Sequence, residues 1–189
     1  MILLDFSNIF MACVHQNIRA SKQPSSMYTG NVESENGISE DLLRHMVLNS
    51  IRSINKNFRG KYGDLIICCD SKAPWRETYF PHYKHKRKKK RKEDSVDWDA
   101  VYKFKNVMIA ELDEFFPYPI ISVENAEADD VIAVLSHIAN DIEEDTVIVG
   151  NDKDFVQLIT EYVSLYAKAK DILYVQKDDS QVSSLEEYF

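Results

Sequence analysis

Four apolar runs with the length and composition of β-strands each stop at an acidic residue or an acidic cluster. The runs ILLD, LIICCD, IISVENAEADD and TVIVGNDKD end, respectively, at Asp5, at Asp70, at Glu127, Asp129 and Asp130, and at Asp152 and Asp154. In an open parallel sheet the carboxyl ends of neighbouring strands share one edge, so carboxylates far apart in sequence meet there. Crowded carboxylates repel one another, and hard divalent cations with oxygen ligands relieve that repulsion. The pattern therefore predicts a divalent-metal site.

Each of these acidic residues also has a simpler explanation. Aspartate begins turns and caps helices, and for Asp5 or Asp70 alone that explanation is the more economical one. The first turn of a helix favours negative charge, which would account for Asp129 and Asp130. Glu127 and Asp130, however, are three residues apart and would share a helix face. The coincidence of acidic residues at four strand ends favours the metal hypothesis.

The basic residues are concentrated in one segment. Positions 82–92, HYKHKRKKKRK, hold eight of the 23 lysines and arginines in a chain whose formal net charge is −8. A block of like charge is usually a solvated or disordered surface. A carboxylate-rich site would also need a separate positive element to attract a phosphate backbone, which gives the segment a second explanation.

The elements that would hold these residues alternate between strands and helices. Strands are predicted over residues 1–6, 64–70, 118–123 and 146–150, helices over 39–60, 97–116, 126–140 and 154–160, and a hairpin over 163–176. Residues 21–37 are predicted to form a mobile loop. Strands this apolar, alternating with helices, predict a three-layer α/β fold around a parallel sheet.

The composition excludes several classes of protein. A chain of 189 residues that is 44% hydrophobic and 29% charged suits one globular domain. No apolar run approaches the roughly 20 residues of a membrane span, and the three cysteines form no CxxC pair, so a cytoplasmic protein without membrane contact is expected. The motifs GxSxG and HExxH and the Gly-rich phosphate loop are absent, so oxygen-bound Mg²⁺ or Mn²⁺ is the expected cofactor.

The acidic positions, together with WRETYFPHYKHKR at 75–87, resemble the flap endonuclease family of 5′ nucleases, and within it the bacteriophage ribonuclease H branch. The segments LLDFS, LRHMVLNSI, IICCDSKAPWR, FPHYKHKR, VDWD, EADDVIAVL and NDKDF occur in that family's order and cover most of the chain. The resemblance implies a PIN-like catalytic domain over residues 1–189. It also implies a basic helical arch or disordered loop at about 75–97.

The resemblance further implies a role for each candidate residue. The first metal ion would be bound by Asp5, Asp70, Glu127 and Asp129, with Asp130 as an additional carboxylate, and the second ion by Asp152 and Asp154. The phosphate and the base would be contacted by Arg76, Tyr83, Lys84 and Arg87, of which Lys84 and Arg87 form a YKxxR pair facing the scissile phosphate. The implied chemistry is phosphodiester hydrolysis with two Mg²⁺ or Mn²⁺ ions. Its catalytic residues would be Asp70, Asp129, Lys84 and Arg87.

The implied activity is that of a 5′-3′ exonuclease and flap endonuclease acting on DNA and on RNA–DNA hybrids, as in primer removal during phage replication. The expected partners are nucleic acids with a 5′ end or flap, and replication proteins such as a single-strand-binding protein or a clamp. A monomer in the host cytoplasm is expected if a phage encodes the protein. In the family a GDxxDN motif and a helix-hairpin-helix-like DNA-binding module follow the point where this sequence stops. That module is expected to be absent from this chain, and the second metal to bind weakly.

Two other functions stay open from the sequence. A PIN-type endoribonuclease would share the carboxylates but generally lacks the YKxxR segment, and it would cleave single-stranded RNA without needing a 5′ end. A non-catalytic accessory module would bind single-stranded nucleic acid with a steep salt dependence and cleave nothing at any Mg²⁺ concentration.

Overall fold

A six-stranded sheet forms the centre of the computed structural model, which describes residues 1–189 except 22–37, 73–74, 81, 93, 95 and 177–189. The strands are β1 (Ile2–Asp5), β2 (Leu65–Cys68), β3 (Ile120–Ile121), β4 (Thr146–Val149), β5 (Val163–Ala167) and β6 (Ile172–Tyr174). Their order is β3-β2-β1-β4-β5-β6, and all pairs are parallel except β5 with β6. The predicted α/β sheet and the terminal hairpin are confirmed. The mobile loop predicted at 21–37 lies, from residue 22 on, outside the described residues.

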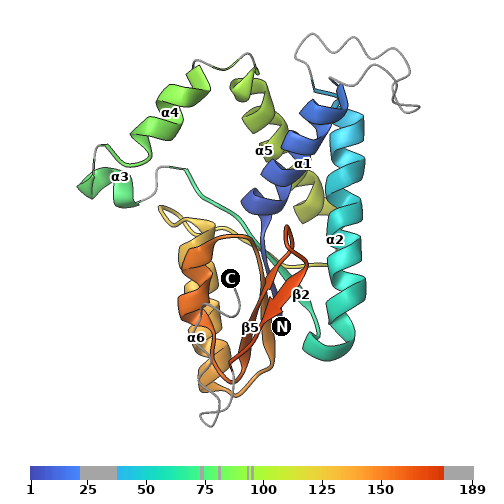
Figure 1. Cartoon of the computed structure of the whole chain (residues 1–189), viewed down its shortest axis with the longest axis vertical. Coiled ribbons are helices and arrows are strands. Elements are labelled where there is room, and N and C mark those ends of the chain that lie inside the picture. Colours follow the sequence, from blue (N-terminus) through green and yellow to red (C-terminus); the bar gives the residue numbers. More distant parts are fainter. Residues whose placement is uncertain (22–37, 73–74, 81, 93, 95, 177–189) are drawn as a thin grey trace.

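Helices cover both faces of the sheet (Figure 1). The helices α1 (Phe6–Ser21), α2 (Glu40–Tyr62) and α5 (Trp98–Phe115) pack on one face, and α6 (Ala128–Asp141) and the 3-10 helix η1 (Lys153–Leu158) on the other. Along β1, Ile2 and Leu4 enter the first core and Leu3 the second, so the strand is buried on both sides. Among the helices of the described residues, none combines the length and apolar character that crossing a membrane requires.

Polar caps set the boundaries of the helices that the sequence predicted. Ser39 caps α2 by accepting the Leu42 N–H at 3.4 Å, and Asp97 caps α5 by accepting the Ala100 N–H at 3.0 Å. Gly63 ends α2 with φ of 80°, a left-handed conformation that glycine adopts without steric cost. Local capping thus sets the residues at which α2 and α5 begin.

Two parts of the fold differ from the prediction. The strand predicted over 118–123 contains only β3, beside Pro119, which has no N–H to donate although its carbonyl accepts the Ile67 N–H at 2.9 Å. Helix α1 follows β1 without a linker and was not predicted. In the segment expected to form a basic helical arch or a disordered loop, the described residues include two short helices, α3 (Trp75–Tyr79) and α4 (His85–Lys92). Figure 1 shows these two helices beyond the carboxyl ends of the strands, apart from the sheet.

Gly150 follows β4 where the chain turns toward Asp152, and no larger residue fits there without a shift. A Cβ at Gly150 would lie 2.8 Å from the Phe155 ring, whereas a Cβ at Gly60 in α2 would meet nothing within 4 Å. Because Phe155 is buried, its ring can move only by disturbing the core.

We therefore expect Gly150→Ala to lower the free energy of unfolding by about 1–3 kcal/mol. Gly60→Ala, inside a helix, should instead raise it by up to about 1 kcal/mol. Urea unfolding of both variants measures the two changes, and equal stabilities would contradict the close approach of Gly150 to Phe155.

Candidate active site at the carboxyl edge of the sheet

Four carboxylates at the carboxyl edge of the sheet form one electrostatically coupled group. Asp5 ends β1, Asp70 lies two residues beyond β2, Asp129 lies in the first turn of α6 and Asp152 follows β4. The negative charges of Asp129 and Asp70 act on Asp5. Those of Asp152 and Asp70 act on Asp129. We call these four residues the carboxylate group. Their charges interact at the sheet edge that the strand pattern indicated.

Burial makes two of these four carboxylates, Asp5 and Asp129, costly to ionise. Asp5 is 6% exposed, and desolvation together with the charges of Asp129 and Asp70 raises its pKa to about 7. Desolvation and the charges of Asp152 and Asp70 raise the pKa of Asp129 to about 6. Side chains whose charged form is disfavoured in this way are stabilised by a bound cation.

Two members of the carboxylate group also cap helices. The Asp5 carboxylate accepts the Asn8 N–H at 3.0 Å in the first turn of α1. The Asp152 carboxylate accepts the Asp154 N–H at 3.1 Å as the N-cap of η1. Asp5 and Asp152 therefore do cap helices, as the simpler explanation of an acidic residue after a strand predicted. They are also coupled electrostatically to other members of the carboxylate group.

Asp70 is held through both of its carboxylate oxygens. The Ser7 hydroxyl and the Lys105 ammonium group, the latter at 3.3 Å, donate to Oδ2, and the Ala128 N–H donates to Oδ1 at 2.9 Å. Burial opposes ionisation of Asp70, but the Lys105 charge and these hydrogen bonds hold its pKa below the usual value. Asp70 is therefore ionised and fixed in orientation.

Lys105 is a site residue that the sequence reasoning missed. It is 8% exposed on the buried face of α5, between Val101 and Met108 at helical spacing. A lysine on the apolar face of an amphipathic helix is the signal that could have revealed it, because a buried ammonium group needs a partner.

A pair of asparagines next to the carboxylate group was also missed. Asn151 Nδ2 donates to Asn8 Oδ1 at 2.7 Å, and Asn151 Oδ1 accepts the Ala169 N–H at 2.7 Å. These bonds tie the loop after β4 to α1 and to the turn between β5 and β6. They fix the chain just after Asp5 and just before Asp152.

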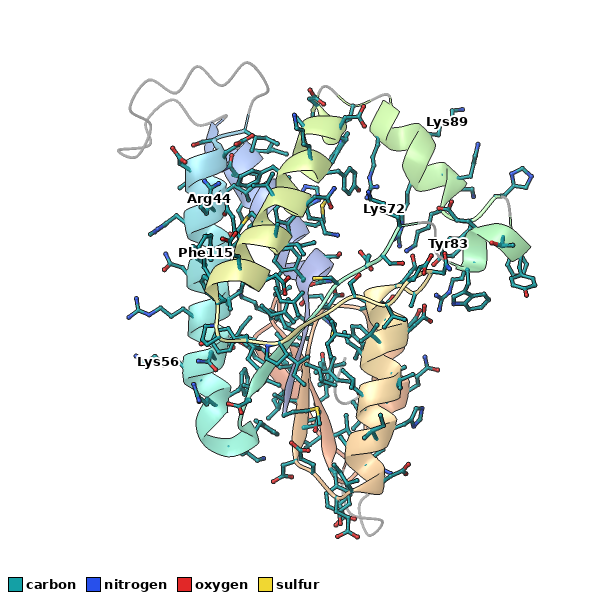
Figure 2. The ribbon with its side chains drawn as sticks, turned by 180° about the vertical axis from the view of Figure 1, so that it is seen from behind. Arg44, Lys56, Lys72, Tyr83, Lys89 and Phe115 are labelled. Carbon is teal, nitrogen blue, oxygen red and sulfur yellow. The ribbon has the colours of Figure 1, made fainter. Side chains whose placement is uncertain are left out.

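Glu127 is bonded to the 75–87 segment. Its Oε2 accepts from Arg76 Nη1 at 3.2 Å and from the Tyr83 hydroxyl at 2.7 Å, and its Oε1 accepts from Lys84 Nζ at 2.6 Å. Lys84 has φ of 53°, an uncommon left-handed conformation for a lysine, at the turn into α4. Figure 2 shows Tyr83 near the N-terminal end of α6 and Lys89 extending from α4 away from it.

Asp130 is bonded to the same segment. Arg76 donates two hydrogen bonds to its carboxylate, at 2.7 and 2.8 Å, and Trp75 Nε1 donates a third at 3.3 Å. These contacts, led by the Arg76 hydrogen bond, lower the pKa of Asp130. The predicted phosphate contact, Arg76, and the predicted additional metal ligand, Asp130, are thus each other's partners in this structure, and both roles stay predictions.

The remaining candidates, Arg87 in α4 and Asp154 in η1, are exposed and lie outside the carboxylate group.

Carboxylate oxygens are the donors that hard divalent cations prefer, so the chemistry of the group suits such an ion. Across the described parts of the chain, however, no three Asp, Glu, His or Cys side chains stand close enough together to hold a metal ion. The predicted metal ligands therefore stay predictions.

An open cavity of about 510 Å³ borders Asp70. Its lining includes Lys72 from the loop after β2, Asn106 of α5 and Asn125 from the loop before α6. Figure 2 shows Lys72 between α5 and the helices α3 and α4. The cavity leaves room for a polar ligand of nucleotide size directly beside the carboxylate group.

The chain belongs to the 5′-3′ exonuclease family, because residues 26–185 match the family's N-terminal resolvase-like domain. Ribonuclease H of Enterobacteria phage T4 is 31% identical over 131 residues, which cover 68% of this chain and 43% of the phage protein. Flap endonuclease Xni of Psychromonas ingrahamii is 36% identical over 104 residues, covering 53% of this chain and 36% of that protein. The resemblance found in the sequence is confirmed, and the chain spans less than half the length of these curated relatives.

The fold is also that of a solved flap endonuclease. The bacteriophage T5 D15 flap endonuclease, in a pseudo-enzyme-product complex with DNA and metal ions, superposes with a TM-score of 0.66 at 18% identity. The match covers 92% of this chain and 57% of the T5 chain. The predicted PIN-like 5′ nuclease fold is therefore confirmed.

Proposed function

We propose that this chain is a metal-dependent 5′-3′ exonuclease and flap endonuclease that hydrolyses phosphodiester bonds in DNA and in RNA–DNA hybrids. The observation that carries the proposal is the carboxylate group at the sheet edge, together with the basic segment 82–92 that stands apart from the sheet. The family membership, the ribonuclease H and flap endonuclease relatives, and the T5 complex with DNA and metal ions support it. Its setting would be replication in the cytoplasm, the host's if a phage encodes it, alongside proteins such as a single-strand-binding protein or a clamp.

The carboxylate group would hold divalent ions, Mg²⁺ or Mn²⁺, with Glu127, Asp130 and Asp154 as further ligands. A bound ion lowers the pKa of a water molecule and stabilises charge on the phosphate oxygens. The protein's own part is orientation: the Asn8 N–H fixes Asp5, and the bonds to Asp70 hold that carboxylate ionised. Side chains held in this way do not need to reorganise when the substrate arrives.

Lys84 and Arg87 would neutralise charge that develops on the scissile phosphate. Lys84 is bonded to Glu127, so a phosphate would replace that carboxylate as its partner. The same exchange would release Tyr83 from Glu127 to stack on a base, and Arg76 from Asp130 to contact a phosphate. Substrate binding would then free Glu127 and Asp130 from their partners in the same step.

Lys84→Ala is expected to reduce single-turnover cleavage of a 5′-flap substrate by about 10²–10³-fold, because it removes a charge that acts on the transition state. Arg87→Ala should have an effect in the same range. Lys89→Ala is the matched control, since Lys89 is an exposed cation of the same basic segment, and its effect should stay below about threefold. Equal rates for the Lys84 and Lys89 variants would contradict the assigned role.

The function is tested with 5′-labelled flap, nicked-duplex and RNA–DNA hybrid substrates, with Mg²⁺ and with EDTA. The proposal predicts Mg²⁺-dependent release of short products that requires a 5′ end. Cleavage of single-stranded RNA independent of its 5′ end would instead identify a PIN-type endoribonuclease. Salt-sensitive binding without cleavage at any Mg²⁺ concentration would identify a non-catalytic binding module.

A further inference from the structure

A cation from outside the 75–87 segment contacts the carboxylate group directly. Lys105 comes from α5, and its ammonium group donates both to Asp70 Oδ2 and to the Ser7 hydroxyl, which itself donates to Asp70. Lys105, Ser7 and Asp70 therefore form a closed set of contacts between α5, α1 and the end of β2. The Lys105 charge also acts on Asp5 at the end of β1.

Packing alone does not explain a lysine at this position. Lys105 is 8% exposed, and its neighbours on the same helix face, Phe104 and Met108, are core residues. Removing an ammonium group from water costs several kcal/mol, and an apolar side chain of similar volume would pack here without that cost. The negative charge of the carboxylate group is what the buried ammonium group offsets.

Lys105 differs from the other cations at the site in how firmly it is placed. The Lys84 side chain is 37% exposed and that of Lys105 is 10% exposed. Lys84 lies directly before α4, a helix that stands apart from the sheet. Lys105 lies within α5, whose buried face forms part of the main core. Lys84 is therefore open to solvent, whereas Lys105 is enclosed where it contacts Ser7 and Asp70.

We propose that Lys105 is a built-in counter-ion of the carboxylate group, which competes with a divalent cation for Asp70 and thereby sets the metal concentration at which the site fills. The inference rests on the proposed function, because both require that the carboxylate group binds a divalent ion. It assigns Lys105 a positioning role: it acts through Asp70 and contributes no bond to the reacting phosphate. It also predicts that metal affinity is held below what the carboxylates alone would give.

The test measures Mn²⁺ binding to the metal-free chain without nucleic acid, using the EPR signal of free Mn²⁺. Lys105→Met should bind Mn²⁺ about tenfold more tightly than the wild type, because a unit charge a few ångströms from the ion is removed. Lys105→Arg keeps the charge and should stay within about threefold of the wild type. Lys103→Met, at an exposed lysine of the same helix, should leave the affinity unchanged.

A thermal-unfolding series provides a second readout that does not depend on activity. Metal-free Lys105→Met should unfold at a lower temperature than the wild type, and saturating Mn²⁺ should raise its unfolding temperature by more than it raises that of the wild type. Equal or weaker Mn²⁺ binding by a folded Lys105→Met overturns the proposal while leaving the proposed function intact. Absence of Mn²⁺ binding to the wild type overturns both. If Lys105→Met does not fold, Lys105→Gln takes its place, and the same two outcomes apply.

Discussion

Replacing Asp129 with asparagine is expected to reduce cleavage of a 5′-flap substrate by about 10³-fold or more. Asparagine has the same size but no charge, and Asp129 is the residue on which Asp152, Asp70 and Glu127 all act. Loss of its charge therefore weakens the site where the proposed metal ions must bind. Asp70→Asn is expected to have an effect of the same order, since Asp70 is the ionised carboxylate oriented by Ser7 and Lys105.

The experiment is single-turnover cleavage at saturating Mg²⁺, with circular dichroism to establish that each variant is folded. Asp113→Asn is the matched control, because it makes the same chemical change at an exposed position of α5. Its rate should equal that of the wild type. A folded Asp129→Asn variant that keeps more than a tenth of the wild-type rate would show that the carboxylate group is not the catalytic centre.

Replacing Asp5 with asparagine is expected to stabilise the metal-free protein while abolishing its activity. The pKa of Asp5 is raised from 3.8 to about 7, so the folded state favours the protonated form more than the unfolded state does. The stability that this proton contributes is fully present below pH 3.8 and is lost as the pH rises to about 7. Asparagine mimics the protonated form at every pH and can still accept the Asn8 N–H.

Urea unfolding in EDTA at pH 5 and pH 8 measures this effect. The stability advantage of Asp5→Asn over the wild type should be about 2 kcal/mol larger at pH 8 than at pH 5. Mn²⁺ should reduce the difference at pH 8, because the wild type alone keeps the full ligand set. The same pH dependence in both proteins would mean that Asp5 is ionised in the fold without cost.

The strand ends were predictable from the sequence because their signal is local. ILLD and TVIVGND are apolar runs that stop at an acid, and a parallel sheet leaves only one edge for such ends to meet. The structure accordingly couples Asp5 to Asp129 and Asp129 to Asp152. The helix starts predicted at residues 39 and 97 were equally local, and α2 and α5 begin directly after Ser39 and Asp97, which cap them.

The pairing of side chains was not predictable, because it depends on how distant elements are rotated and placed. Lys105 meets Asp70 only because α5 turns that face toward β2, and residue spacing within either element carries no information about this contact. The same holds for Arg76 and Asp130, which the resemblance assigned to the substrate and to a metal ion and which the structure bonds to each other. Helix α1 escaped prediction because its cap, Asp5, is also the last residue of β1.

Anomalous diffraction from a crystal of the chain soaked in Mn²⁺ tests most directly whether the carboxylate group binds metal, because it locates each bound ion relative to these four side chains. We expect Mn²⁺ about 2.1 Å from carboxylate oxygens of the group formed by Asp5, Asp70, Asp129 and Asp152. A second ion near Asp152 and Asp154 would support the two-metal mechanism. Bound Mn²⁺ elsewhere on the molecule, with none at these carboxylates, would contradict the account.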